Sequence, residues 1–179
     1  MERLVNRHRD FTEPLPLRVA MGTYNINGGK HFRSIVYKNV SLSDWIYAHR
    51  QNGKKGELGK MRPPATTFMY SHPSATDDKS DDKRIDIYAF GFEEMVDLDA
   101  KNIMNTSSEN AKSWAQELTK TLNTDGEKFT LVTYQQLVGV CLYVFIRPDL
   151  APHIKDVAVD SVKTGMGGAT GNKGSVAIR

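Results

Sequence analysis

Three short segments of the chain carry residue types that suit a phosphate group or the metal ion that accompanies one. They are Thr23–Gly29, Gly91–Glu94 and Lys163–Gly174, and the third reads K-T-G-M-G-G-A-T-G-N-K-G. Amide and carboxylate oxygens suit a hard cation such as Mg²⁺, while glycines allow a backbone to approach a ligand closely. The chemistry favoured by these residue types is therefore metal-assisted handling of a phosphate.

The first segment places two asparagines two positions apart at the end of an apolar run. If the extended conformation continues, Asn25 and Asn27 share one face, where their carboxamides could orient a metal-bound water or a phosphate oxygen. An Asx-turn is the alternative interpretation, because Asn and Gly are the commonest turn residues. The local sequence leaves both open.

The second segment ends in two adjacent glutamates. Glu93 and Glu94 point in different directions in an extended or turning backbone, so only one is expected to face a site. One carboxylate is enough for Mg²⁺, which keeps most of its waters and also binds substrate oxygens. A pair of solvated surface charges remains the alternative.

The third segment has too many glycines for a regular helix or strand and is interpreted as a loop. Lys173 supplies a point charge and Asn172 a neutral donor, so the loop could cradle a phosphate. It is no Walker A loop, because Gly174 follows the lysine, and no dinucleotide fingerprint, because Thr170 takes the last glycine position. The alternative is a flexible surface hairpin.

Apolar periodicity predicts alternating strands and helices that position these segments. In the first strand, Leu17, Val19 and Met21 are expected on the buried face. Further strands are expected at 85–93, 129–134, 137–146, 157–162 and 175–179, with Gln135–Gln136 as the connection between the third and fourth strands. A short helix is expected from Ser43, with Trp45, Ile46 and Ala48 inward.

A second helix carries the strongest local pattern. Thr106–Glu109 reads as a capping box, and Asn123 stops the helix. One apolar stripe follows the box and consists of Ala111, Trp114, Ala115, Leu118 and Leu122.

Polar composition predicts a linker or disordered tail at 1–16 and a disordered insertion at 51–83, in which Thr67–Tyr70 could add a strand fragment.

Composition bounds the class of protein. With 179 residues, the chain is long enough for one domain or a large part of one. The single cysteine, Cys141, lies in an apolar run and is expected to be a buried thiol in a reducing, cytoplasmic compartment. A net charge of +3 does not indicate a nucleic-acid binder, and no stretch approaches the ~20 apolar residues of a transmembrane helix.

The three segments, in this order, resemble the inositol polyphosphate 5-phosphatases of the DNase I-like superfamily. Phe32–Ser34, Glu94–Leu98 and Gln136–Val140 add to the resemblance, which runs from about Arg18 to Arg179 apart from the insertion. It implies an α/β fold, an incomplete four-layer sandwich with mixed sheets, in which 17–179 form the amino-terminal half of a catalytic domain.

The resemblance also implies a cofactor, ligands and a substrate. Mg²⁺ is implied, with Glu94 as its ligand and Asn25 beside it, and Asn172, Lys173 and Asn27 are candidate contacts to substrate. The substrate would be the 5-phosphate of phosphatidylinositol 4,5-bisphosphate or a related lipid or soluble inositol phosphate, with peripheral membrane contact by the parent protein.

Other motifs of the resembling family do not occur in this sequence. These are a Trp-x-Gly-Asp-x-Asn segment that holds the catalytic base, a Cys-Asp-Arg segment and an Asp-His pair. The base and the phosphate-binding histidine are therefore expected beyond Arg179, and the chain alone is expected to be inactive. Two alternatives are another DNase I-like phosphodiesterase, such as an endonuclease, and a short non-catalytic form that binds anionic headgroups or partners.

Overall fold

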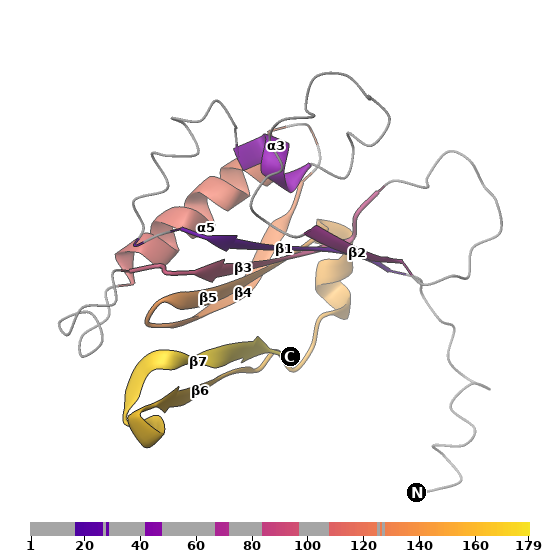
Figure 1. The fold of residues 1–179 in the computed structure, drawn as a ribbon. Coiled ribbons are helices and arrows are strands. Elements are labelled where there is room, and N and C mark those ends of the chain that lie inside the picture. The colour runs from indigo at the N-terminus through magenta and orange to yellow at the C-terminus, as the bar shows by residue number, and fades with distance from the viewer. Residues whose placement is uncertain are drawn as a thin grey trace, which may run out of the picture.

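The computed structural model of the chain is a mixed α/β structure in which helices cover one face of a sheet (Figure 1). It describes residues 17–26, 28, 42–47, 67–71, 84–96, 108–124, 126 and 128–179, with the backbone alone at 67–71, 171 and 172. The elements are β1 (Arg18–Asn25), α3 (Leu42–Ile46), β2 (Thr67–Ser71), β3 (Ile87–Glu93), α5 (Glu109–Leu122), β4 (Thr130–Leu137), β5 (Val140–Ile146), η3 (Pro148–His153), β6 (Val159–Gly165), η4 (Met166–Gly168) and β7 (Thr170–Ile178).

Five of the strands form one sheet of mixed orientation, in the order β2-β1-β3-β5-β4. β1 and β3 are parallel, with Asn25 opposite Glu93, whereas the other neighbours are antiparallel. Because parallel strands end at the same edge of a sheet, this pairing brings the first two segments of interest together. The α/β class with mixed sheets agrees with the expectation from sequence.

The helix layer packs on the aromatic face of this sheet. All five residues of the predicted stripe on α5 are buried, and Trp114 contacts Phe92 with ring centroids 4.8 Å apart. The hydroxyl of Tyr143 on β5 donates to the carbonyl of Ala111 at 2.9 Å. The stripe therefore predicts the packing of α5 correctly.

On β1 the faces are the reverse of those expected. Ala20 and Gly22 are buried under the helix layer, whereas Met21 is 42% exposed. A Cβ at Gly22 would lie 2.9 Å from Cζ2 of Trp45, so only a glycine leaves room for that indole. Two small residues therefore face Trp45 in the middle of β1, and Tyr24 follows them on the same face with its ring centroid 5.8 Å from that of Trp45.

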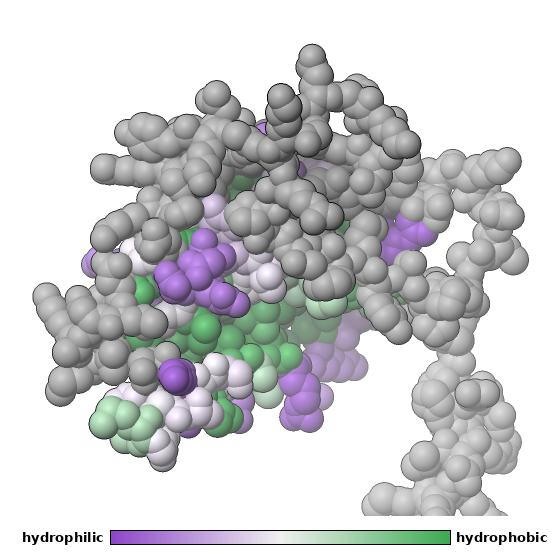
Figure 2. Space-filling model, viewed as in Figure 1, coloured by the Kyte–Doolittle hydropathy of each residue, from purple (hydrophilic) through white to green (hydrophobic). Residues whose placement is uncertain are grey.

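The opposite side of the sheet is only partly covered. β6 and β7 pair as an antiparallel hairpin that lies against β4 and β5 (Figure 1). Hydrophobic surface shows over the sheet above this hairpin (Figure 2). The exposed large apolar side chains are Met21, Ile154, Val157, Val159, Val162 and Met166.

Three local predictions need correction. The capping box is wrong, because α5 begins at Glu109 and its N-cap Ser108 makes no side-chain cap hydrogen bond. The turn between β4 and β5 lies at Val138–Gly139 and not at the two glutamines, because Gln135 and Gln136 pair with Leu142 and Cys141 within the ladder. β7 begins at Thr170, so most of the predicted glycine loop is strand.

Other expectations fall partly outside the described residues. Trp45 and Ile46 are buried in α3 as predicted, although the helix begins at Leu42. Ala48 and the tail at 1–16 lie outside the described residues. Within 51–83, the strand fragment considered at Thr67–Tyr70 is present as β2, and the rest lies outside the described residues.

Candidate functional site

The carboxyl ends of β1 and β3 bring an amide and a carboxylate into contact. Asn25 Nδ2 donates to Glu94 Oε1 at 2.9 Å, although the two residues are 69 positions apart in sequence. Both side chains are exposed. This edge is also where open α/β sheets commonly bind ligands, outside the carboxyl ends of parallel strands.

Glu94 has a backbone conformation that separates it from Glu93. Its φ of 53° lies in the left-handed region, where a residue with a Cβ is uncommon and costs about 1 kcal/mol or more. This turn ends β3 and directs the Glu94 carboxylate toward Asn25. Glu93 is thus the register partner of Asn25 in the sheet, whereas the carboxylate that is hydrogen-bonded to the asparagine is that of Glu94.

Four hydrogen bonds fix the backbone around this carboxylate. The Glu93 carbonyl accepts from the Ile26 N–H at 2.9 Å, and the Glu94 carbonyl accepts from the Gly28 N–H at 2.8 Å. The Met95 N–H donates to the Gly139 carbonyl at 2.8 Å, and the Met95 carbonyl accepts from Asn110 Nδ2 at 2.8 Å. Met95 and Ile26 are fully buried. An exposed carboxylate therefore rests on a rigid base.

The donor set is compatible with Mg²⁺. It consists of one carboxylate and one side-chain amide, both of which offer hard oxygen atoms. Among the described residues, no group of three or more His, Cys, Asp or Glu side chains is gathered as in a zinc site. A single carboxylate suits a cation that keeps several waters and takes further oxygens from a phosphate substrate.

The glycine segment forms the tip and one strand of the β6–β7 hairpin. Gly167 and Gly168 have φ values of 68° and 92°, which the tight turn after β6 requires. Lys173 is exposed on β7, and the side chain of Asn172 is not described. In the described part of the chain, no ion pair joins Lys173 to Glu94. Asn27 lies outside the described residues.

The link between the hairpin and the Glu94 segment passes through residues to which the sequence analysis assigned no role in the site, although Gln136–Val140 belongs to the resemblance. A Cβ at Gly174 would lie 2.6 Å from Leu137 Cδ2, so β7 lies directly on the end of β4. The turn that follows, Val138–Gly139, accepts the hydrogen bond from Met95. A glycine inside the apolar run 137–146 was the signal for this turn, because a two-residue hairpin favours glycine.

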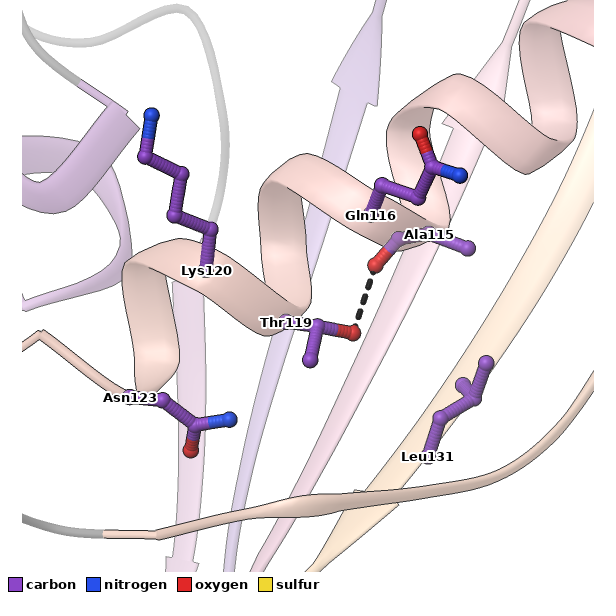
Figure 3. A pocket seen from close by; sticks show the side chains of 6 residues that line it. All are labelled: Ala115, Gln116, Thr119, Lys120, Asn123 and Leu131. Carbon is purple, nitrogen blue, oxygen red and sulfur yellow. Dashed lines mark hydrogen bonds between the residues drawn. The ribbon is translucent and has the colours of Figure 1, made fainter.

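A separate shallow hollow lies away from this edge. It has a volume of about 400 Å³ and lies between the carboxyl-terminal half of α5 and the start of β4. Figure 3 shows its lining, in which the Thr119 hydroxyl donates to the Ala115 carbonyl at 2.7 Å and is already satisfied. Its lining residues are Ala115, Gln116, Thr119, Lys120, Asn123 and Leu131. The hollow contains no carboxylate and is not the candidate site.

Comparison with known proteins defines the class. Residues 22–179 match the model of endonuclease/exonuclease/phosphatase family 2, and the chain belongs to this family. It is similar to synaptojanin-1 of Rattus norvegicus, with 50% identity over 94% of this chain and 10% of that protein. It is also similar to human synaptojanin-2, with 44% identity over the whole chain and 11% of that protein. The chain thus spans about a tenth of the length of these relatives.

A more distant relative and a solved structure agree with this result. Inositol-1,4,5-trisphosphate 5-phosphatase 1 of Schizosaccharomyces pombe is 28% identical over 98% of this chain and 13% of that protein. A crystal structure of the inositol polyphosphate 5-phosphatase domain of SPsynaptojanin, in complex with inositol (1,4)-bisphosphate and calcium, matches with a TM-score of 0.58. That match covers 99% of this chain and 40% of the solved chain at 24% identity, and it supports the fold.

Proposed function

We propose that this chain is part of the catalytic domain of a magnesium-dependent phosphoinositide 5-phosphatase. Its substrate would be the 5-phosphate of phosphatidylinositol 4,5-bisphosphate or of a related soluble inositol phosphate. The observation that carries the proposal is the Asn25–Glu94 hydrogen bond at the carboxyl ends of two parallel strands. The relatives named as synaptojanins and as an inositol-1,4,5-trisphosphate 5-phosphatase support the substrate class.

The residues of this chain have distinct roles in the proposed site. Glu94 holds the cation through its carboxylate, and Asn25 orients that carboxylate through its Nδ2. Lys173, with Asn172 and Asn27, contacts phosphate groups of the substrate. The cation, when bound, supplies Lewis-acid stabilisation of charge on the phosphoryl oxygens.

We assign no residue of this chain to the activation of water. The motifs to which the resemblance assigns the base and the phosphate-binding histidine do not occur in the sequence. Alignment of nucleophile and phosphoryl group contributes much of the rate acceleration, so half of a site gives little catalysis. We therefore expect the 179-residue chain alone to release no phosphate.

The proposed location is the cytoplasm, with peripheral contact to membranes. In the portion that the structure describes, no helix has the length and hydrophobicity to span a bilayer. We propose that a lipid substrate contacts the protein through the surface that carries the site.

The direct test uses the parent protein with inositol 1,4,5-trisphosphate and identifies the product by ion-exchange chromatography. We expect inositol 1,4-bisphosphate and one phosphate per turnover, with activity lost in EDTA and restored by Mg²⁺. Hydrolysis of DNA without hydrolysis of inositol phosphates would instead support an endonuclease of the same family. Release of a phosphate other than the 5-phosphate would also contradict the proposal.

A further inference from the structure

We propose that the β4–β5 turn, Leu137–Val140, is the positioning element that fixes the Glu94 carboxylate and the β6–β7 hairpin relative to each other. The inference rests on the proposed function and assigns a role to residues outside the metal-binding and phosphate-binding set. Two contacts and one backbone conformation carry it, and each involves a different residue of the turn.

The first contact joins the turn to the metal end of the site. The Gly139 carbonyl accepts from the Met95 N–H at 2.8 Å, one residue after Glu94. Met95 is fully buried, so this bond is shielded from water. Because Glu94 has a φ of 53°, its conformation needs such support from the residues around it. The turn thus helps to hold the direction of the carboxylate.

The second contact joins the turn to the glycine hairpin. A Cβ at Gly174 would lie 2.6 Å from Leu137 Cδ2 and would clash with the Val162 carbonyl oxygen, so only glycine fits. Leu137 is 7% exposed, and the hairpin is therefore seated on a buried side chain. Lys173 precedes Gly174 directly, so the position of its charge follows from this seat.

The third observation concerns the turn itself. Val138 has a φ of 47°, which a β-branched residue adopts at a high cost, whereas Asn or Gly is usual in such a hairpin. Its side chain is 6% exposed, and its carbonyl accepts from Gln136 Nε2 at 2.9 Å. Strain of this kind persists only where the surroundings determine the conformation, and it often marks a functional site.

These contacts make the turn a shared support. A shift of the turn moves the Glu94 segment through Gly139 and the hairpin through Leu137, and thereby changes the distance between cation and phosphate contacts. Displacements near 1 Å are enough to cost about a hundredfold in rate when reacting groups must be aligned. The turn is thus expected to affect substrate handling and metal binding together.

The test compares Val138→Pro with Val138→Gly in the parent protein. Proline fixes φ near −65° and cannot adopt the turn, while glycine adopts positive φ freely. We expect Val138→Pro to raise both the KM for inositol 1,4,5-trisphosphate and the Mg²⁺ concentration for half-maximal activity about tenfold or more. It should also weaken Mn²⁺ binding, measured by electron paramagnetic resonance, by a similar factor. Val138→Gly should leave these values within about twofold, with some loss of thermal stability.

These readouts separate positioning from simple support of the fold. KM, Mg²⁺ dependence and Mn²⁺ affinity per folded molecule do not change when a variant only lowers the folded fraction. Wild-type values in Val138→Pro would overturn the inference. If that variant does not fold, Leu137→Ala provides the test, because it removes the contact with Gly174 and keeps the turn. We expect Leu137→Ala to raise the KM for inositol 1,4,5-trisphosphate without changing the Mn²⁺ affinity. An unchanged KM would overturn the proposal. An inactive wild-type parent would contradict the proposed function itself, whereas Mn²⁺ affinity would still report on the turn.

Discussion

The two ends of the parallel pair β1 and β3 both carry an acidic side chain, but the surroundings of the two carboxylates differ. At the amino end, Asp86 Oδ2 accepts from the backbone N–H of Arg18 at 2.6 Å. Its Oδ1 pairs with Arg147 Nε at 3.1 Å, and Arg147 also pairs with Asp149 at 2.9 Å. Asp86 is only 8% exposed. Its charge is therefore neutralised within the fold.

At the carboxyl end, Glu94 is exposed and accepts a hydrogen bond from the neutral amide of Asn25. Across the ranges that the structure describes, no Lys, Arg or His forms an ion pair with Glu94. A carboxylate that is held in place but not neutralised keeps its attraction for a cation. We therefore expect the amino end to serve stability and the proposed site at the carboxyl end to bind the cation, and substitutions at the two ends can test this difference.

The largest effect on activity is expected from Glu94→Gln in the parent protein. Loss of the carboxylate removes several kcal/mol of electrostatic stabilisation, which corresponds to a fall of about a thousandfold or more in kcat/KM. Thermal unfolding should change little, because the side chain is exposed. Glu93→Gln is the matched control and should stay within about threefold. An equal fall in kcat/KM in both variants would show that Glu94 has no role in the site distinct from that of Glu93.

At the other end, Asp86→Asn should act on stability. It leaves Arg147 without its most buried partner, and breaking a buried ion pair costs about 3 kcal/mol in the free energy of unfolding. The KM and Mg²⁺ dependence of the folded protein should remain unchanged. Urea unfolding measures the free energy of unfolding, and enzyme kinetics at urea concentrations below the unfolding transition measure the KM and the Mg²⁺ dependence. A changed Mg²⁺ dependence in Asp86→Asn would contradict the division of roles between the two ends.

A smaller effect is expected from Lys173→Ala on β7. An exposed charged contact to a phosphate contributes about 1.5 kcal/mol, so the KM for inositol 1,4,5-trisphosphate should rise about tenfold. The Mg²⁺ dependence should not change, because no ion pair joins Lys173 to Glu94 among the described residues. Lys163→Ala, on the paired strand β6, provides a matched charge control. An unchanged KM in Lys173→Ala would reduce the hairpin to a structural element.

Ionisation or modification of Cys141 is expected to have the smallest effect on the two ends of the β1–β3 pair. Cys141 is a buried free cysteine in the middle of β5. Burial raises the pKa of its thiol from 9.0 to about 11, and burial also raises the pKa of Tyr143. Both groups therefore favour the protonated form in the folded state. The Cys141 contribution to stability is present below pH 9 and is lost as pH rises toward 11.

Two measurements check this expectation. The native thiol should react with a disulfide reagent at pH 8 at least about a hundred times more slowly than the urea-unfolded thiol, because two pKa units lower the thiolate fraction by that factor. Thermal stability should fall between pH 9 and 11, and less so in Cys141→Ser. Rapid reaction of the native protein would contradict the burial of this side chain.

Periodicity and strand order predicted much of the fold. The stripe on α5 is fully buried, and β1 and β3 end at the residues expected for them. The preference for Glu94 over Glu93 came from the resemblance, because two adjacent glutamates do not reveal which one turns inward. The positive φ of Glu94 settles its direction, and it arises from hydrogen bonds with segments distant in sequence.

The wrong predictions have tertiary causes. The alternation in β1 predicted that Val19 and Met21 lie on its buried face. Gly22 faces the helix layer instead, because the Trp45 indole occupies the space next to its Cα. The glycines from Gly171 to Gly174 looked like a loop, yet they lie in β7, where Gly174 allows close packing on Leu137. Such close contacts depend on residues that are far apart in the sequence, and no local pattern contains them.

The most direct test of the account is the position of a bound divalent cation. Crystals of the intact catalytic domain soaked in Mn²⁺ would give an anomalous difference peak. We expect that peak beside the Glu94 carboxylate, with Asn25 in contact with the same carboxylate and the β6–β7 hairpin on the same side. A peak at Asp86 and Asp149, or a Glu94 side chain without a cation in a catalytically active crystal, would contradict it.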